Sequence, residues 1–123
     1  MGEEKDIQWL NEPEDKDYPA AGSYMTLLWP ETDAAEWVKK LRKAKVVKFK
    51  AKDIFRASQL SLLGVSNSHV KTDRKKIKKG VALSPLLLVR DTPNGKLVIA
   101  DGYHRLCAVY SFNEDIWIPA KII

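Results

Sequence analysis

Residues 97-LVIADGYHRLCAVY-110 carry most of the information about the fold, because one apolar run passes through Asp-Gly directly into a second. The first run, from Leu97 to Ala100, has the composition of a buried strand. Gly102 interrupts that strand, and the apolar residues after Arg105 fit a buried helix. The sequence therefore predicts a strand, a tight turn and a helix in direct succession.

The turn at the start of that helix has the features of an anion site. The first amides of a helix lack internal partners, and the aligned peptide dipoles leave a partial positive charge there. Gly102 would let the backbone approach a ligand, Arg105 offers a forked guanidinium, and His104 can donate from either ring nitrogen. Asp101 has a structural alternative, because aspartate often caps a helix at this place. From the residues alone, phosphate binding and an ordinary solvated turn both remain open.

Upstream of this turn, the hydrophobic pattern predicts three elements. The run 23–29, SYMTLLW, favours a strand or an extended segment. A helix is expected to begin at Asp33, which lies three residues before Glu36 in a capping-box arrangement. Residues 45–51 alternate apolar and basic side chains, which indicates a half-exposed strand.

The second half of the chain predicts a helix, a hairpin and a last strand. Residues 70–79 have few apolar positions and fit a short, exposed, basic helix, with Gly80 as its stop signal. The hairpin is expected over 86–100, because two apolar runs flank the turn residues DTPNG. The apolar residues at 116–123 predict a final strand.

A polar cluster, Ser66 to His69, precedes the basic helix. Asn67 or Ser68 is expected to cap that helix, since both residue types accept hydrogen bonds from free helix amides. The same loop could close over a bound nucleotide, with Asn67 and Ser68 as contacts. Turn formation alone accounts for the cluster equally well.

Length and composition indicate one folded domain. The chain has 123 residues, of which 45% are hydrophobic and 30% charged, and its formal net charge is +5. Chains of this size bury one core, and this composition differs from that of disordered segments. Residues 1–22 are expected to form an irregular acidic lead-in, and residues 23–123 the domain.

The sequence also bears on where the protein is located in the cell and on whether it binds zinc. No run approaches the ~20 apolar residues needed to span a bilayer, and the acidic start differs from a secretory signal. A cytoplasmic protein is therefore expected. Cys107 is the only cysteine, so no internal disulfide can form, and two histidines with one cysteine predict no zinc site. Cys107 is expected to pack in the core as a small hydrophobe.

The order of a strand, the motif 101-DGYHR-105, Ala108 and then 118-IPA-120 before a final strand resembles the ParB/sulfiredoxin superfamily. The resemblance covers residues 46–123, with Asp53-Ile54 at the superfamily's first strand and Ser84-Pro85 before the next one. It implies a stand-alone bacterial member of this group. The implied fold is a compact α+β domain in which helices flank a small mixed sheet.

In that superfamily the corresponding turn binds the phosphates of CTP, ATP or ADP. The resemblance therefore implies nucleotide contacts at Gly102, Tyr103, His104 and Arg105, with magnesium bridging the phosphates. The motif is most similar to its form in a serine kinase, which makes Asp101 and His104 candidate catalytic residues for nucleotide hydrolysis or phosphate transfer to a small acceptor. Tyr103 stands where sulfiredoxins have their catalytic cysteine, so sulfinic-acid reductase activity is not expected.

A rival prediction rests on the basic helix. It holds six positive side chains, which would attract phosphate-bearing partners: Lys71, Arg74, Lys75, Lys76, Lys78 and Lys79. These residues predict a nucleic-acid-binding module or a nuclease, with a non-catalytic protein-interaction domain as a further alternative. DNA reading by a downstream helix-turn-helix domain, as in partition proteins, is not expected, because the sequence ends at Ile123. A solvated helix face explains the same pattern.

Overall fold

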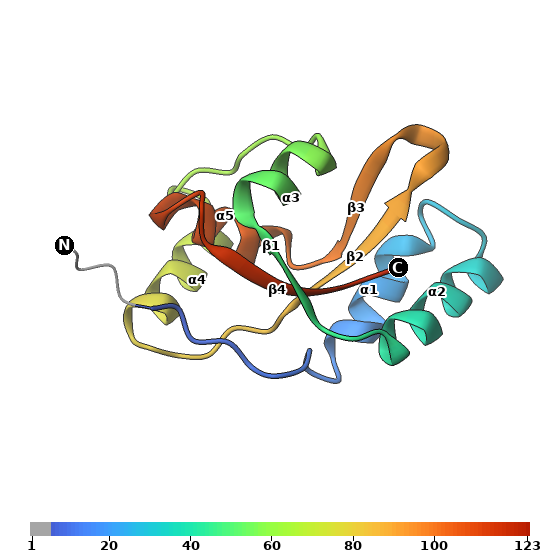
Figure 1. The fold of residues 1–123 in the computed structure, drawn as a ribbon, viewed down its shortest axis with the longest axis horizontal. Coiled ribbons are helices and arrows are strands. Elements are labelled where there is room, and N and C mark those ends of the chain that lie inside the picture. Colours follow the sequence, from blue (N-terminus) through green and yellow to red (C-terminus); the bar gives the residue numbers. More distant parts are fainter. Residues whose placement is uncertain (1–5) are drawn as a thin grey trace.

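A mixed four-stranded sheet organises the fold, with its strands in the order β1-β4-β2-β3 (Figure 1). The computed structural model describes residues 6–123. β1 (Val47–Lys50) pairs antiparallel with β4 (Trp117–Ile122), and β4 pairs parallel with β2 (Leu86–Asp91). β2 then pairs antiparallel with β3 (Lys96–Asp101) across a short 3-10 turn, η1 (Thr92–Asn94). The fold is α+β, in agreement with the sequence-based expectation.

Helices cover both faces of this sheet. α1 (Asp17–Met25) and α2 (Glu31–Lys43) lie on one face, where they bury Leu87, Val89 and Val98. α3 (Ala51–Ser58), α4 (Ser68–Lys78) and α5 (Tyr103–Phe112) lie on the other face, over Leu88 and Ile99. Neighbouring residues of one strand point to opposite faces, so β2 and β3 are buried on both sides. Two apolar cores therefore sandwich the sheet.

Most elements of the second half are confirmed. The hairpin, the helix after Gly102 and the last strand occur where they were expected. The expected cap of α4 is Asn67, whose side-chain oxygen accepts hydrogen bonds from the amides of His69 and Val70, at 3.0 and 3.2 Å. Gly80 ends this region with a φ of +75°, a conformation that favours glycine.

The strand predicted over 23–29 is wrong. Helix α1 runs to Met25, and hydrogen-bonded turns follow it. The reason lies in residues that look irregular in isolation: Tyr18, Ala21 and Met25 recur at helical spacing, and all three are buried against the sheet. The irregular lead-in is therefore also wrong for residues 17–22, while residues 1–5 lie outside the described chain.

Two other local predictions fail at helix starts. α2 begins at Glu31 after Pro30, and no side-chain hydrogen bond caps it, so the capping box of Asp33 and Glu36 is wrong. Asp53-Ile54, which the resemblance places in a strand, lie in helix α3 instead. Burial of Ile54 on one face of α3 explains this outcome. Among residues 6–123, no helix is long and apolar enough to cross a membrane.

Candidate functional site

The turn between β3 and α5 is built around Gly102. This glycine has a φ of +111° and is the N-cap of α5. A Cβ atom at Gly102 would lie 2.7 Å from Cγ of Leu86 and 2.9 Å from Nη2 of Arg105. The protein's own packing therefore requires glycine here, whether or not a ligand approaches the backbone.

Arg105 and Asp101 form an ion pair beneath this turn. Nη2 of Arg105 lies 2.9 Å from Oδ2 of Asp101, and the two side chains are only 17% and 18% exposed. The same nitrogen also donates to the carbonyl of Pro85 at 3.4 Å, while Nε is buried without a partner among the described residues. Burial raises the pKa of Asp101, and the positive charge of Arg105 opposes that rise. The positive charge of Arg105, which was expected to reach a phosphate, is thus already paired with Asp101.

The expectation that Asp101 caps helix α5 is wrong. No side-chain hydrogen bond caps the start of α5, and the carboxylate points its Oδ2 at Arg105 instead. The first amides of α5 are consequently not satisfied by a capping side chain. These amides are the donors that an anion at a helix start would use.

His69 and His104 lie side by side at the helix starts. Their ring centroids are 4.7 Å apart, although the residues are 35 positions apart in the sequence. His69 is the second residue of α4 and His104 the second residue of α5. The Tyr103 ring packs on His104 with centroids 5.7 Å apart, and its hydroxyl donates to the carbonyl of Ser61.

Helices α4 and α5 run in the same general direction, and their N-terminal ends lie side by side. Their first turns meet at the histidine pair, and Arg74, in the middle of α4, reaches the Ser111 hydroxyl and the Phe112 ring in the last turn of α5. Two aligned helix dipoles place partial positive charge at the same end. Burial, followed by the neighbouring His69, lowers the pKa of His104 below its ordinary 6.5, and Asp73 opposes this shift. The site therefore disfavours a positive charge on His104.

The basic helix α4 begins beside the histidine pair with Lys71 and extends away from it, so most of its basic residues lie apart from the turn. Lys78 lies nine residues after His69, which corresponds to about 14 Å along a helix at 1.5 Å per residue. Arg74 is partly engaged within the protein, because its guanidinium lies 4.2 Å from the Phe112 ring and donates to Ser111. The remaining basic side chains of this helix are exposed: Lys71, Lys75, Lys76, Lys78 and Lys79. Three of these lysines also stabilise the negative end of the α4 dipole.

The polar loop before α4 reaches the turn through His69, not through Asn67. The Asn67 side chain is occupied as a cap, which confirms the structural role expected for it. Ser68 is exposed at the first position of α4, and its carbonyl accepts a hydrogen bond from Thr72. The sequence predicts Asn67 and Ser68 as contacts but not His69. The only feature of the sequence that could have indicated a role for His69 is its position next to the helix cap.

Cys107 lies in the core, as expected. It is fully buried and free, and burial raises the pKa of its thiol. A thiol held in its neutral form is a poor nucleophile. Among residues 6–123 there is no cluster of three or more histidine, cysteine, aspartate or glutamate side chains that could hold a metal ion.

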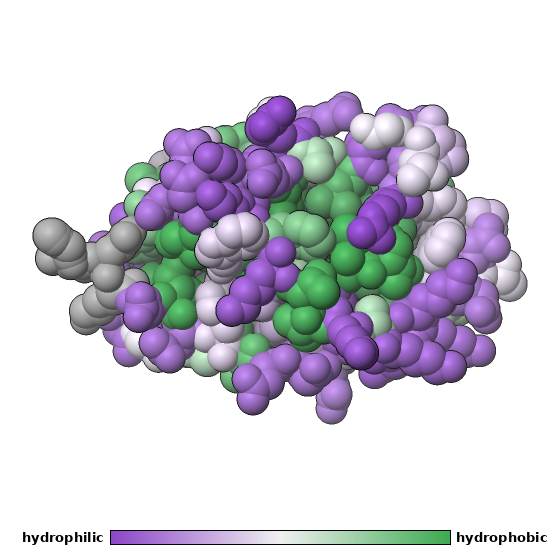
Figure 2. All heavy atoms as spheres, in the orientation of Figure 1, coloured by the Kyte–Doolittle hydropathy of each residue, from purple (hydrophilic) through white to green (hydrophobic). Residues whose placement is uncertain are grey.

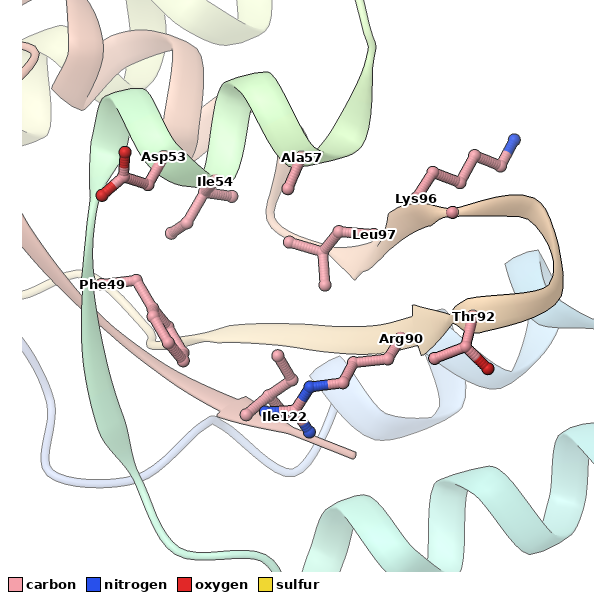
Figure 3. Close-up of a pocket in the computed structure, with 10 residues that line it drawn as sticks. Phe49, Asp53, Ile54, Ala57, Arg90, Thr92, Lys96, Leu97 and Ile122 are labelled. Atoms are coloured by element: carbon pink, nitrogen blue, oxygen red, sulfur yellow. The ribbon is translucent and has the colours of Figure 1, made fainter.

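A hollow of about 490 Å³ lies elsewhere, between α3 and the β2–β3 hairpin (Figure 3). It is lined by residues of six elements and by none of the residues of the turn 101–105. Sequence reasoning missed it, because Phe49, Ile54 and Leu97 read separately as ordinary core positions. Their alternation predicts burial but cannot tell a filled core from an open one.

No protein-family model, no curated protein and no solved structure matches this chain.

Proposed function

We propose that the α4–α5 helix starts bind the phosphate group of a nucleotide. The observation that carries this proposal is the pair of imidazoles, 4.7 Å apart, at two helix N-termini that point the same way. Each N-terminus attracts negative charge, and each imidazole can donate a hydrogen bond to a phosphate oxygen. An anion between His69 and His104 would be held by both.

The ion pair at Asp101 gives Arg105 a positioning role in this proposal. Its guanidinium packs under Gly102 and fixes the backbone whose amides face the ligand. A phosphate would add a second anion near Arg105, whose Nε has no partner among the described residues. Gly102 and Tyr103 would contribute backbone and ring contacts to the nucleotide, and Ser68 its hydroxyl.

Magnesium, which the family resemblance implies, would enter with the nucleotide. The described residues offer no cluster of three acidic or imidazole groups, and the Asp101 carboxylate is already paired. Magnesium prefers phosphate and carboxylate oxygens with several waters, so the phosphates themselves would supply most of its ligands. When bound, it would neutralise charge on the phosphates.

Catalysis is a further step, and Asp101 and His104 are its candidates. The lowered pKa keeps the His104 imidazole neutral near pH 7, a state that can accept a proton from a hydroxyl or a water. Asp101 would first have to release Arg105 to act on a small acceptor. Binding therefore stands on geometry, and hydrolysis or transfer stands on the resemblance and on this proton acceptor.

Calorimetry with ATP, ADP and CTP, with and without magnesium, tests binding in the full chain. Sulfate serves as the minimal probe, because its charge does not change near neutral pH. Loss of one hydrogen bond of about 1.4 kcal/mol lowers affinity about tenfold, which is the effect expected for His104→Leu and for His69→Leu, because leucine has no side-chain donor. Lys48→Gln, which removes an exposed positive charge from β1, is the matched control and is expected to change affinity less than twofold.

The pH dependence sharpens this test. An anion beside His104 raises the pKa of that imidazole, so sulfate binding takes up a proton and strengthens as the pH falls from 7.5 to 5.5. The increase should become smaller in His104→Gln and disappear when His69→Gln is added, because both imidazoles face the bound anion. Absence of binding by sulfate and by all three nucleotides would overturn the proposal.

A further inference from the structure

The hollow beside α3 has the form of a site for an apolar molecule. Its walls come from Phe49 of β1, Ile54 and Ala57 of α3, Leu97 of β3 and Ile122 of β4. Its volume of about 490 Å³ lies within the ~300–1,000 Å³ common for small-molecule sites. Figure 2 shows apolar surface in this region between hydrophilic neighbours, and Figure 3 shows Phe49, Ile54 and Leu97 facing one space.

One positive charge stands at the edge of this space. The Arg90 side chain extends from β2 along the sheet toward Ile122 (Figure 3). Within residues 6–123 this guanidinium makes no ion pair and no side-chain hydrogen bond, and Arg90 is exposed. Lys96 and Asp53 also line the rim, but in Figure 3 the Lys96 ammonium and the Asp53 carboxylate both turn away from the space.

We propose that this hollow binds a small organic monocarboxylate with an apolar body, such as a medium-chain fatty acid. The apolar walls would cover the hydrocarbon, whose burial provides the main driving force. The Arg90 guanidinium would take the carboxylate in a forked, two-bond contact. Arg90 extends along the space while the Lys96 ammonium turns away from it, so a monoanion fits better than a multiply charged phosphate. The proposal is independent of the phosphate site at α5.

The experiment uses decanoate and 1-decanol as probes of the full chain. Amide chemical shifts in two-dimensional NMR would locate binding, and calorimetry would give the affinity. Decanoate should shift amides of α3, β3 and β4 and leave those of residues 101–105 unchanged. Arg90→Gln should weaken decanoate about tenfold and leave decanol within twofold, because only the charged head contacts the guanidinium.

Two further variants complete the design. Ala57→Trp places a large side chain over the hollow from an exposed position on α3, and it should abolish binding of both probes while circular dichroism stays unchanged. Arg56→Gln removes an exposed guanidinium from the same helix outside the hollow, and it should leave both affinities within twofold. Sulfate binding in Arg90→Gln should equal that of the parent.

Four results would overturn the proposal. They are no decanoate binding at millimolar concentration, equal losses of decanoate and decanol in Arg90→Gln, equal effects of Arg56→Gln and Arg90→Gln, and shifts centred on the turn 101–105. Shifts of the hollow's amides that grow with protein concentration alone would identify a second copy of the chain as the occupant. That outcome would also refute a carboxylate site.

Discussion

Gly102→Ala is the most direct test of how the β3–α5 turn is built. Alanine at a φ of +111° adopts a conformation that side chains disfavour by about 1–2 kcal/mol. Its Cβ would also approach Cγ of the fully buried Leu86 to 2.7 Å, and overpacking of this kind costs about 1–3 kcal/mol. The expected loss in the free energy of unfolding is therefore about 2–5 kcal/mol, a large part of the ~5–15 kcal/mol available to a domain.

The chain supplies two matched controls for that substitution. Gly95 has a φ of +62°, and a Cβ atom added there would meet nothing within 4 Å, so Gly95→Ala isolates the backbone penalty. Gly64 has open space and no such φ, so Gly64→Ala should change stability by less than about 1 kcal/mol. Urea unfolding followed by tryptophan fluorescence measures all three. Equal midpoints for Gly102→Ala and Gly95→Ala would refute the packing argument.

Three further predictions concern charged groups. Burial raises the pKa of Asp101 above 3.8, so the folded protein binds this proton more tightly than the unfolded chain does. The stability that comes from this proton is present below pH 3.8 and is lost as the pH rises through the higher folded pKa. Asp101→Asn should therefore remove this pH-dependent part of the free energy of unfolding, measured in urea between pH 4 and 7. If nucleic acid binds the basic helix, the double variant Lys75→Gln, Lys76→Gln should contact about two fewer phosphates. The slope of log affinity against log salt concentration, measured by fluorescence anisotropy, should then be less steep than that of the parent. The Lys121 side chain is 3% exposed and donates to the carbonyl of Arg42. Lys121→Met should lower the free energy of unfolding by about 1–2 kcal/mol, and Lys121→Ala should lower it more, as measured by thermal unfolding.

Local chemistry explains which parts of the fold were predictable. The hairpin, the α5 start and the α4 cap depend on residues within a few positions of each other. Gly102 could be assigned to a turn because few other residues accept its φ. Asn67 could be assigned to a cap because its side chain reaches the amides two and three residues on. Such local signals predict structure independently of the tertiary contacts of the chain.

The failures share a dependence on distant contacts. α1 is helical up to Met25 because it packs on the sheet, and Asp17 is buried where its carboxylate accepts a hydrogen bond from Ser84 at 2.6 Å. The sequence between 17 and 29 does not reveal that partner, which lies 67 residues away. α3 likewise takes its helical form with Ile54 facing the core. Tertiary burial overrode weak local preferences in both segments.

The candidate site was predictable in its backbone but not in its side chains. The sequence located the helix start, whereas the ion pair of Arg105 with Asp101 and the approach of His69 to His104 required the fold. An i,i+4 pair on a helix is a common arrangement, but here Asp101 lies in the strand, before the helix begins. Arg105, which was expected to bind phosphate most strongly, is thus already paired with Asp101.

Strand β3 connects the two proposed sites and also keeps them apart. Leu97 lines the hollow on the α3 side of the sheet, whereas the irregular β2–β3 register pairs Asp101 with Leu87, which faces α1 and α2. Four residues at about 3.3 Å each place these positions about 13 Å apart. Ile99 lies between them in the core, where it is only 7% exposed, so packed side chains separate the hollow from the turn. A carboxylate beside Arg90 and a phosphate beside His104 should therefore bind additively, with neither changing the affinity of the other.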